Sequence, residues 1–291
     1  MDIAILPYEY RARGRLSQVP LGALRWPLGG CRRSGTVGDL ARDDHLLIYP
    51  HSDHFYDPRA GVRCRISLLI AEPLAVQRAK YLAALALRWR FWRIVTHRPA
   101  MARWAGNALV MPFGGCWVHG LQPDSPCKTA HMSLIASAKT ALQGHALRHR
   151  IAGWCRAGDR NVDLLGHAYA PIARKEDGLL PYRYSVVIEN SREAGYFTEK
   201  LIDCLLCGTL PIYWGAPDIG QYFDTDGLVE CRDENDIKRA IAAASTRQFE
   251  DRQAALQRNR ERALDFVDYE KNAAARLMEI ASGGQYCPVG H

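Results

Sequence analysis

The sequence predicts an α/β protein made of two domains, each with a parallel sheet. The chain has 291 residues, which is about two domains of roughly 150 residues each. Short runs of β-branched and apolar residues alternate with longer segments of helical pattern, and this alternation is typical of βαβ units. A turn-rich segment at 119–128 contains Gly and Pro and separates two such arrays. We therefore place an N-terminal α/β domain at 1–122 and a C-terminal α/β domain at 123–291.

The first array begins at the N-terminus. MDIAILPYEYRARG lacks a basic start followed by a long apolar run, so we interpret it as a first strand and not as a signal peptide. Residues 74–90 are rich in Ala and Leu and predict a helix. Strands are expected at 3–6, 46–49, 66–70, 93–96 and 108–111. No apolar run approaches 18 residues, so we expect no transmembrane helix and a cytoplasmic protein.

The third of these strands is followed by an acidic residue. RISLLIA, at 65–71, reads as a strand, and Glu72 stands at its carboxyl end. Ligands of open parallel sheets bind outside the carboxyl ends of the strands. A carboxylate placed there can take a proton from a hydroxyl group. A solvated acid at a strand-to-helix turn is the alternative, and Asp43, Asp44 and Asp53 are competing candidates from polar loops.

The second array contains the most informative stretch, YRYSVVIENSREAGYFTEKLIDCLLCGTLPIYWG at 182–215. It reads as a strand at 185–188, a polar loop, a helix at 198–207 and a second buried strand at 210–214. This unit follows a strand at 133–136 and a helix at 142–157, and a helical tail at 233–280 completes the domain. The polar loop lies where a parallel sheet binds its ligands.

The residues of this loop fit the binding of a diphosphate. Thr198 is a suitable N-cap, and Lys200 adds a positive charge to the backbone N–H groups of a helix start. A guanidinium can hold phosphate oxygens in a bidentate fork, and Arg148 is the arginine available from the preceding βα segment. Because Glu199 is adjacent to Lys200, an ordinary capping or surface pair is the alternative interpretation.

The same stretch resembles the signature of glycosyltransferase family 10, the α-1,3-fucosyltransferases. The resemblance is carried by an E-N dipeptide at Glu189, by Tyr-Phe-Thr-Glu-Lys from Tyr196 and by Gly-Thr-Leu-Pro-Ile-Tyr-Trp-Gly at 208–215. Weaker similarities in spacing are KTAHMSLIASAK, GHALR and NVDLLGHAY between 128 and 169. The resemblance implies a GT-B fold, in which two Rossmann-like domains face each other across a cleft.

The resemblance also implies an activity and a set of site residues. The activity is inverting transfer of fucose from GDP-fucose to a glycan hydroxyl, with no metal and no further cofactor. Arg148 and Lys200 would bind the diphosphate, and Glu199 would accept hydrogen bonds from the ribose. Asn190 and Tyr196 would line the donor pocket, and Glu72 would be the general base.

Several other motifs are interpreted as structural. Cys204 and Cys207 form a C-x-x-C inside a predicted helix, where core packing is favoured over metal binding or redox chemistry. His51 and His54 have metal-like spacing without further ligands nearby, and the D-x-D at 224–226 is expected to be a turn. The nine cysteines are odd in number and scattered, and reduced thiols fit them best.

Composition leaves alternatives open. Lys and Arg total 38 against 31 Asp and Glu, for a formal charge of +7. This charge suits an anionic substrate, an anionic membrane surface or nucleic acid. We expect a nucleotide-sugar donor and a glycan acceptor as partners, and no nucleic acid. Transfer from another nucleotide sugar, or a nonenzymatic polyanion-binding protein, remains the alternative. The segment RWRFWRIVTHRPAMARW, at 88–104, leaves a peripheral membrane contact open.

Overall fold

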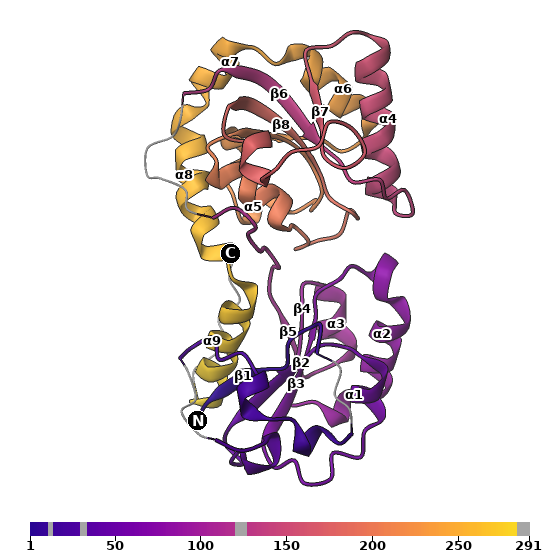
Figure 1. Cartoon of the computed structure of the whole chain (residues 1–291), viewed down its shortest axis with the longest axis vertical. Coiled ribbons are helices and arrows are strands. Elements are labelled where there is room, and N and C mark those ends of the chain that lie inside the picture. The colour runs from indigo at the N-terminus through magenta and orange to yellow at the C-terminus, as the bar shows by residue number, and fades with distance from the viewer. Residues whose placement is uncertain (11–13, 30–33, 120–126, 284–291) are drawn as a thin grey trace. The chain divides into compact units, whose positions relative to one another are not determined.

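The computed structural model describes residues 1–10, 14–29, 34–119 and 127–283. The chain forms two compact units, one of Met1–Pro112 with the helix that begins at Tyr269, and one of Phe113–Asp268 (Figure 1). Each unit contains a five-stranded parallel sheet among the described residues. The predicted α/β class with two parallel-sheet domains is therefore confirmed.

The first unit has its strands in the order β1-β2-β3-β4-β5. They are β1 (Ile3–Ile5), β2 (His45–Ile48), β3 (Arg65–Ile70), β4 (Ile94–Thr96) and β5 (Ala108–Val110). The helices are α1 (Ser52–Tyr56), α2 (Leu74–Ala86), α3 (Pro99–Trp104) and α9 (Tyr269–Ala281). The α2 and α3 crossovers follow adjacent strands, and since such crossovers are right-handed the two helices cover the same face of the sheet. Figure 1 shows α1, α2 and α3 on one side of the sheet and α9 on the other.

The helix α9 joins the first unit through a polar contact. The hydroxyl of Tyr49 donates a hydrogen bond of 2.6 Å to Glu270 and lies 2.8 Å from the hydroxyl of Tyr269. Arg25 forms an ion pair of 3.0 Å with the other Glu270 oxygen. These contacts place the last helix on the sheet of the first unit.

The second unit has its strands in the order β10-β9-β8-β6-β7. They are β6 (Ala130–Ile135), β7 (Asp163–Leu165), β8 (Tyr182–Ile188), β9 (Leu210–Trp214) and β10 (Val229–Glu230). The helices are α4 (Gln143–Ala157), α5 (Glu199–Leu206), α6 (Glu234–Ala243), α7 (Thr246–Asp251) and α8 (Gln253–Ala263). Since β8 lies at the centre of the sheet, its carboxyl end is flanked by other strands on both sides.

The units differ from the predicted ranges 1–122 and 123–291 in two respects. Residues after Pro112 already belong to the second unit, because Gly114 N–H donates to the carbonyl of Phe197 (2.9 Å) and Trp117 N–H donates to Asp203 (2.9 Å). The tail was placed in the C-terminal domain, but α9 returns to the first unit. Residues 120–126, which include the predicted boundary, lie outside the described part of the chain.

Tyrosines and cysteines of the second unit pack in its core, as predicted for the cysteines. Tyr184 and Tyr213 are fully buried, as are Cys204 and Cys207. The seven cysteines in the described ranges are free thiols. No helix in those same ranges is both long and apolar enough to cross a lipid bilayer.

Candidate active site

The carboxylate of Glu189 organises the loop that follows β8. Its side chain is fully buried. One carboxylate oxygen accepts the backbone N–H of Thr198 at 2.8 Å, and the other accepts the Thr198 hydroxyl at 2.7 Å. Because a buried charge needs such partners, Glu189 fixes the start of α5 against the end of β8. In the sequence Glu189 was singled out only as part of a motif, and its positioning role was not predicted, because an acid that follows a strand is more often solvated.

The start of α5 presents Lys200. Thr198 is the N-cap, as expected, and its hydroxyl accepts from the Lys200 N–H and, at 3.0 Å, from Lys200 Nζ. The ammonium also lies 2.9 Å from a Glu199 oxygen and 3.6 Å from a Glu189 oxygen. About a quarter of the Lys200 side chain stays exposed. The ammonium can therefore reach a ligand at the helix start, where backbone N–H groups already favour an anion.

Arg148, on α4, approaches the same strand end. Its Nε donates to the carbonyl of Ile188 (2.9 Å), and one terminal nitrogen donates to Oδ1 of Asn190 (2.7 Å). The side chain is buried. Arg148 and Lys200 thus both contact residues 188–190 and lie within electrostatic reach of each other, so the structure brings together the two cations that were predicted to act together.

The charges of this cluster depend on one another. Burial disfavours charge on Lys200, but the carboxylates of Glu189 and Glu199 outweigh it and raise the Lys200 pKa above its ordinary value. Burial likewise opposes charge on Glu199, yet the ammonium groups of Lys200 and Lys175 lower its pKa. Burial lowers the pKa of Arg148 despite the carboxylates of Glu189 and Glu199. The cluster therefore keeps Lys200 and Glu199 charged at neutral pH.

Two glycines permit this close packing. A Cβ on Gly144 would lie 1.7 Å from the carbonyl oxygen of Glu189, so only glycine lets the start of α4 approach the end of β8. The Gly144 N–H donates to the carbonyl of Asn190 (3.1 Å). A Cβ on Gly215 would lie 2.2 Å from the hydroxyl of Tyr213 and 2.7 Å from Cγ of Glu189. Both positions require glycine because atoms of Glu189 lie directly against them.

A second lysine, Lys175, makes contacts that stabilise the cluster. Lys175 Nζ forms an ion pair of 2.6 Å with the buried Asp203 and donates to the carbonyl of Glu199 at 3.3 Å. Its ammonium also lies 4.8 Å from the centre of the Trp117 ring. Neither Lys175 nor Asp203 stands out in the sequence, because their contact joins residues far apart in the chain.

Asn190 and Tyr196 were predicted to line a donor pocket. Asn190 is half-buried and holds Arg148 through its side chain. Tyr196 is buried and lies within electrostatic reach of Arg148. Both therefore belong to the cluster, and their contact with a donor stays a prediction.

In the first unit, Glu72 stands two residues beyond β3, at the carboxyl edge of the sheet, as predicted. Its backbone carbonyl accepts the hydroxyl of Tyr81 (3.1 Å). Burial raises the pKa of Tyr269 to about 12, and the carboxylates of Glu270 and Glu72 add to the rise. Glu72 is therefore close enough to interact with α9, a contact that the sequence did not predict. Its role as a base stays a prediction.

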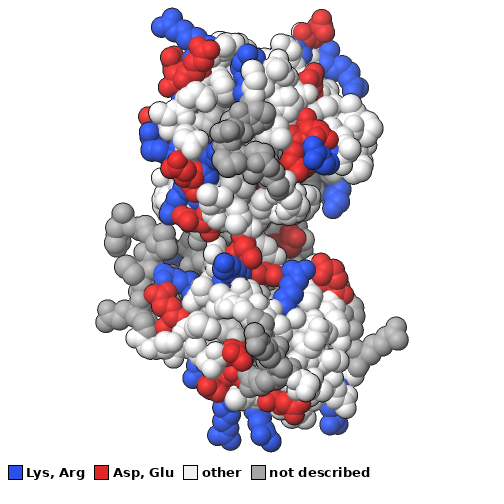
Figure 2. All heavy atoms as spheres, turned by 60° about the vertical axis from the view of Figure 1, so that its left-hand side comes forward, with Lys and Arg blue, Asp and Glu red and all other residues white. Residues whose placement is uncertain are grey.

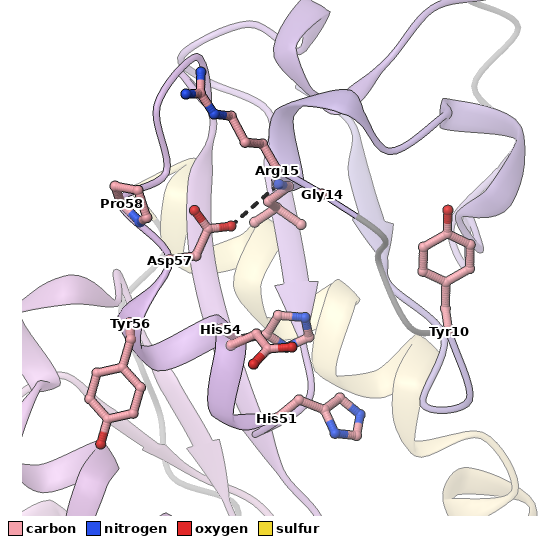
Figure 3. A pocket seen from close by; sticks show the side chains of 10 residues that line it. Tyr10, Gly14, Arg15, His51, His54, Tyr56, Asp57 and Pro58 are labelled. Atoms are coloured by element: carbon pink, nitrogen blue, oxygen red, sulfur yellow. Dashed lines mark hydrogen bonds between the residues drawn. The ribbon is translucent and has the colours of Figure 1, made fainter.

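The competing acids differ in position. Asp44 is buried at the amino end of β2, where it accepts the N–H groups of Asp2 (2.8 Å) and Ala41 (2.9 Å). Asp43 lies 3.7 Å from the N-terminal amine. Both are at the edge opposite to Glu72. Asp53 is exposed and lines a pocket of about 490 Å³ in the first unit (Figure 3).

The contacts of the His51 and His54 pair and of the D-x-D motif agree with the structural interpretation of both. His54 is buried with Nδ1 2.7 Å from the carbonyl of Tyr49, and His51 Nε2 lies 3.0 Å from the carbonyl of Tyr8. Figure 3 shows both rings beside the pocket. Asp224 caps a short turn by accepting the N–H of Asp226 (2.9 Å), so the D-x-D is a turn as expected. In the described ranges, no group of three or more His, Cys, Asp and Glu side chains could hold a metal ion.

Comparison with known sequences identifies a relative. Over 119 residues the chain is 34% identical to the alpha-(1,3)-fucosyltransferase FucT of Helicobacter pylori. The matched stretch covers 41% of this chain and 21% of that protein. The match thus spans about a fifth of the relative. No family model matches the chain. The predicted resemblance to the α-1,3-fucosyltransferases is confirmed by this similarity.

Comparison with solved structures identifies the fold. An α1,3-fucosyltransferase solved with GDP has a TM-score of 0.51 at 14% identity, with 81% of this chain and 77% of that chain covered. An α,α-trehalose-phosphate synthase (UDP-forming) from Burkholderia vietnamiensis has a TM-score of 0.53 at 10% identity, with 84% and 72% covered. TarM has a TM-score of 0.55 at 12% identity, with 83% and 55% covered. The predicted GT-B fold class is therefore confirmed.

Proposed function

We propose that this protein is an inverting glycosyltransferase that transfers fucose from GDP-fucose to a hydroxyl group of a glycan. The observation that carries the proposal is the meeting of Lys200, Arg148 and the N-terminus of α5 at the carboxyl end of β8. Ligands of open parallel sheets bind at this place. The similarity to a fucosyltransferase supports the choice of GDP-fucose.

The donor-binding roles follow from the charge and position of each group. The diphosphate of the donor would lie at the start of α5, between Lys200 and Arg148, where N–H groups and two cations favour negative charge. Glu199 is charged and half-buried, and it would accept hydrogen bonds from the ribose hydroxyls. Asn190 and Tyr196 would complete the pocket. Glu189 would act by holding Thr198 and Lys200 in place.

The proposed reaction breaks the bond between the sugar C1 and the β-phosphate oxygen. Negative charge grows on that oxygen as GDP leaves, and preorganised cations lower the barrier to its departure. We propose that Lys200 and Arg148 are these cations and stabilise the negative charge on the leaving oxygen. The acceptor oxygen attacks C1 from the opposite side, and Glu72 takes its proton, so that configuration at C1 inverts.

Turnover of GDP-fucose tests this proposal. The wild type should release GDP from GDP-fucose in the presence of a glycan acceptor mixture, and Glu72→Gln should lower the rate by about 10²- to 10⁴-fold. GDP affinity should be unchanged in this variant, since the carboxylate acts on the acceptor. Asp53→Asn is the matched control and should keep the wild-type rate. Full activity in Glu72→Gln would contradict the assignment of the base.

The identity of the sugar nucleotide is tested separately. Because a UDP-forming synthase has a similar fold, another nucleotide sugar is the second candidate for the donor. Turnover of a UDP- or CDP-sugar in place of GDP-fucose would support the proposed glycosyltransferase activity and would contradict GDP-fucose as its donor. The polyanion-binding alternative gains no support from the surface in Figure 2, where Lys and Arg are interspersed with Asp and Glu.

A further inference from the structure

We infer that the outer face of α2 and the neighbouring tryptophans form a docking surface for an anionic lipid bilayer. We call this the α2 surface and define it by Arg78, Leu82, Arg88, Trp89, Arg103 and Trp104. The inference does not depend on the proposed transferase activity.

Large apolar side chains of the α2 surface are exposed to water. The exposed fractions are 59% for Leu82, 74% for Trp89 and 72% for Trp104. Trp89 lies in the short 3-10 helix that follows α2, and on α2 itself Ala79 and Ala86, which come before and after Leu82 in the sequence, are exposed as well. This spacing follows one side of a helix. Tyr81 and Ala84 on the opposite side are buried in the core, so the exposed stripe is a second apolar face of the segment.

The tryptophans are held at one edge of the first unit. Trp89 precedes β4 and Trp104 precedes β5, which places both at the amino ends of neighbouring parallel strands. The side-chain amide of Asn107 ties the two segments together, because it donates to the carbonyls of Arg88 (3.0 Å) and Phe91 (2.7 Å). Since α2 and α3 cover the same face of the sheet, the segments that carry the apolar stripe and both indoles lie on that face (Figure 1).

The sequence segment that carries the α2 surface has charges of a single sign. Between Glu72 and Asp124 the sequence contains no acidic residue, and it contains the basic residues Arg78, Lys80, Arg88, Arg90, Arg93, Arg98 and Arg103. Arg78, Arg88 and Arg103 are exposed beside the apolar side chains. The chain as a whole carries nearly as many acidic as basic residues, so the acid-free segment is a local feature.

This combination matches the chemistry of an anionic bilayer. Indole rings favour the boundary between lipid headgroups and acyl chains, and an apolar helix stripe can lie in that boundary while arginines bind lipid phosphates. The phosphates of a nucleic acid would bind the arginines and its bases could stack on the tryptophans, but it has no apolar surface that would bury Leu82, Ala79 and Ala86. The aliphatic stripe therefore favours lipid.

Vesicle sedimentation tests the inference on the full chain. The protein should sediment with phosphatidylcholine vesicles that contain phosphatidylglycerol, and much less with phosphatidylcholine alone. Neutralising Arg88 and Arg103 as Arg88→Gln and Arg103→Gln should each weaken binding by about fivefold, and 0.5 M salt should weaken it further. Leu82→Ser with Trp89→Ser should weaken it by about tenfold or more.

The control variants are matched in exposure. Leu264 and Tyr56 are exposed by 60% and 70% and lie outside the α2 surface. Leu264→Ser with Tyr56→Ser should keep wild-type binding and circular dichroism. Equal losses in both double variants, equal sedimentation with neutral and anionic vesicles, or salt-sensitive binding to duplex DNA without vesicle binding would each overturn the inference.

Discussion

At the scale of single residues, the candidate site depends on the contact between Glu189 and Lys200. The sequence motif indicates that both matter, and it places Lys200 at a helix start. Only the structure reveals that Glu189 is fully buried and faces Thr198 and Lys200. Burial could not be predicted for this residue because an acid after a strand is more often solvated. The positioning role therefore required coordinates.

Replacing the buried carboxylate of Glu189 by an amide should destabilise the protein. In Glu189→Gln the Lys200 ammonium loses one of its carboxylates, and the amide fits the Thr198 hydroxyl less well. We expect a loss of about 1–3 kcal/mol in the free energy of unfolding, since charged hydrogen bonds are strong and Lys200 is partly exposed. Urea denaturation measures this loss. Glu193→Gln, in the same loop, should change stability by less than about 0.5 kcal/mol. Equal stability of the two variants would contradict the role of Glu189.

His45 should make stability depend on pH. It is buried at the start of β2 with its ring 4.4 Å from that of Trp92, and burial, aided by the charge of Arg65, lowers its pKa to about 4. The unfolded chain binds the proton near pH 6.5, so stability should fall as pH decreases from 6.5 toward 4, by at most about 1.4 kcal/mol per unit. His45→Gln should flatten this slope in urea titrations at pH 7, 6 and 5. An unchanged slope would contradict this prediction.

At the scale of elements, most patterned segments were predictable, including the three-residue strands β1, β4 and β5, but two short strands were not. The predicted helix at 198–207 and strand at 210–214 correspond to α5 (Glu199–Leu206) and β9 (Leu210–Trp214), because an N-cap, a terminating Gly208 and an apolar run mark their ends. The strands β7 and β10 have three and two residues. Their sequences, Asp-Leu-Leu and Val-Glu, mix acidic with apolar residues and were not distinguished from loops.

The approach of α4 to β8 can be tested with two glycines of one helix. In Gly144→Ala the new Cβ would meet the Glu189 carbonyl at 1.7 Å, so α4 and Arg148 must move. We expect a loss of about 2–4 kcal/mol, as for other severe steric clashes in a core. Gly153→Ala has nothing within 4 Å of its Cβ and should stabilise the protein by about 0.5–1 kcal/mol. Thermal unfolding of both variants distinguishes them, and a neutral Gly144→Ala would contradict the packing.

At the scale of the whole molecule, the division of the chain was only partly predictable. Composition and alternation indicate two α/β domains, but not that α9 belongs to the first. That assignment depends on Tyr49 and Glu270, which are 221 residues apart. Sequence patterns describe local periodicity, so they do not reveal which sheet a terminal helix covers.

Loss of the α9 contact should affect one unit more than the other. Glu270→Ala removes the partner of the Tyr49 hydroxyl and of Arg25. We expect faster amide hydrogen exchange in β1, β2 and α9, with the exchange of β8 and α5 unchanged. Mass spectrometry of peptic fragments can resolve the two regions. Uniformly faster exchange across both units would show that they unfold together.

The central claim is that Lys200 and Arg148 bind a diphosphate at the end of β8. Calorimetric titration of GDP and GMP into the wild type and Lys200→Met tests it most directly. We expect GDP to bind more tightly than GMP, and Lys200→Met to weaken GDP by about 2 kcal/mol, roughly thirtyfold, with little effect on GMP. The control Lys238→Met removes a lysine of similar exposure, 27% against 24%, which pairs with Glu234 on α6. Unchanged GDP affinity in Lys200→Met, or an equal loss for GDP and GMP, would contradict the claim.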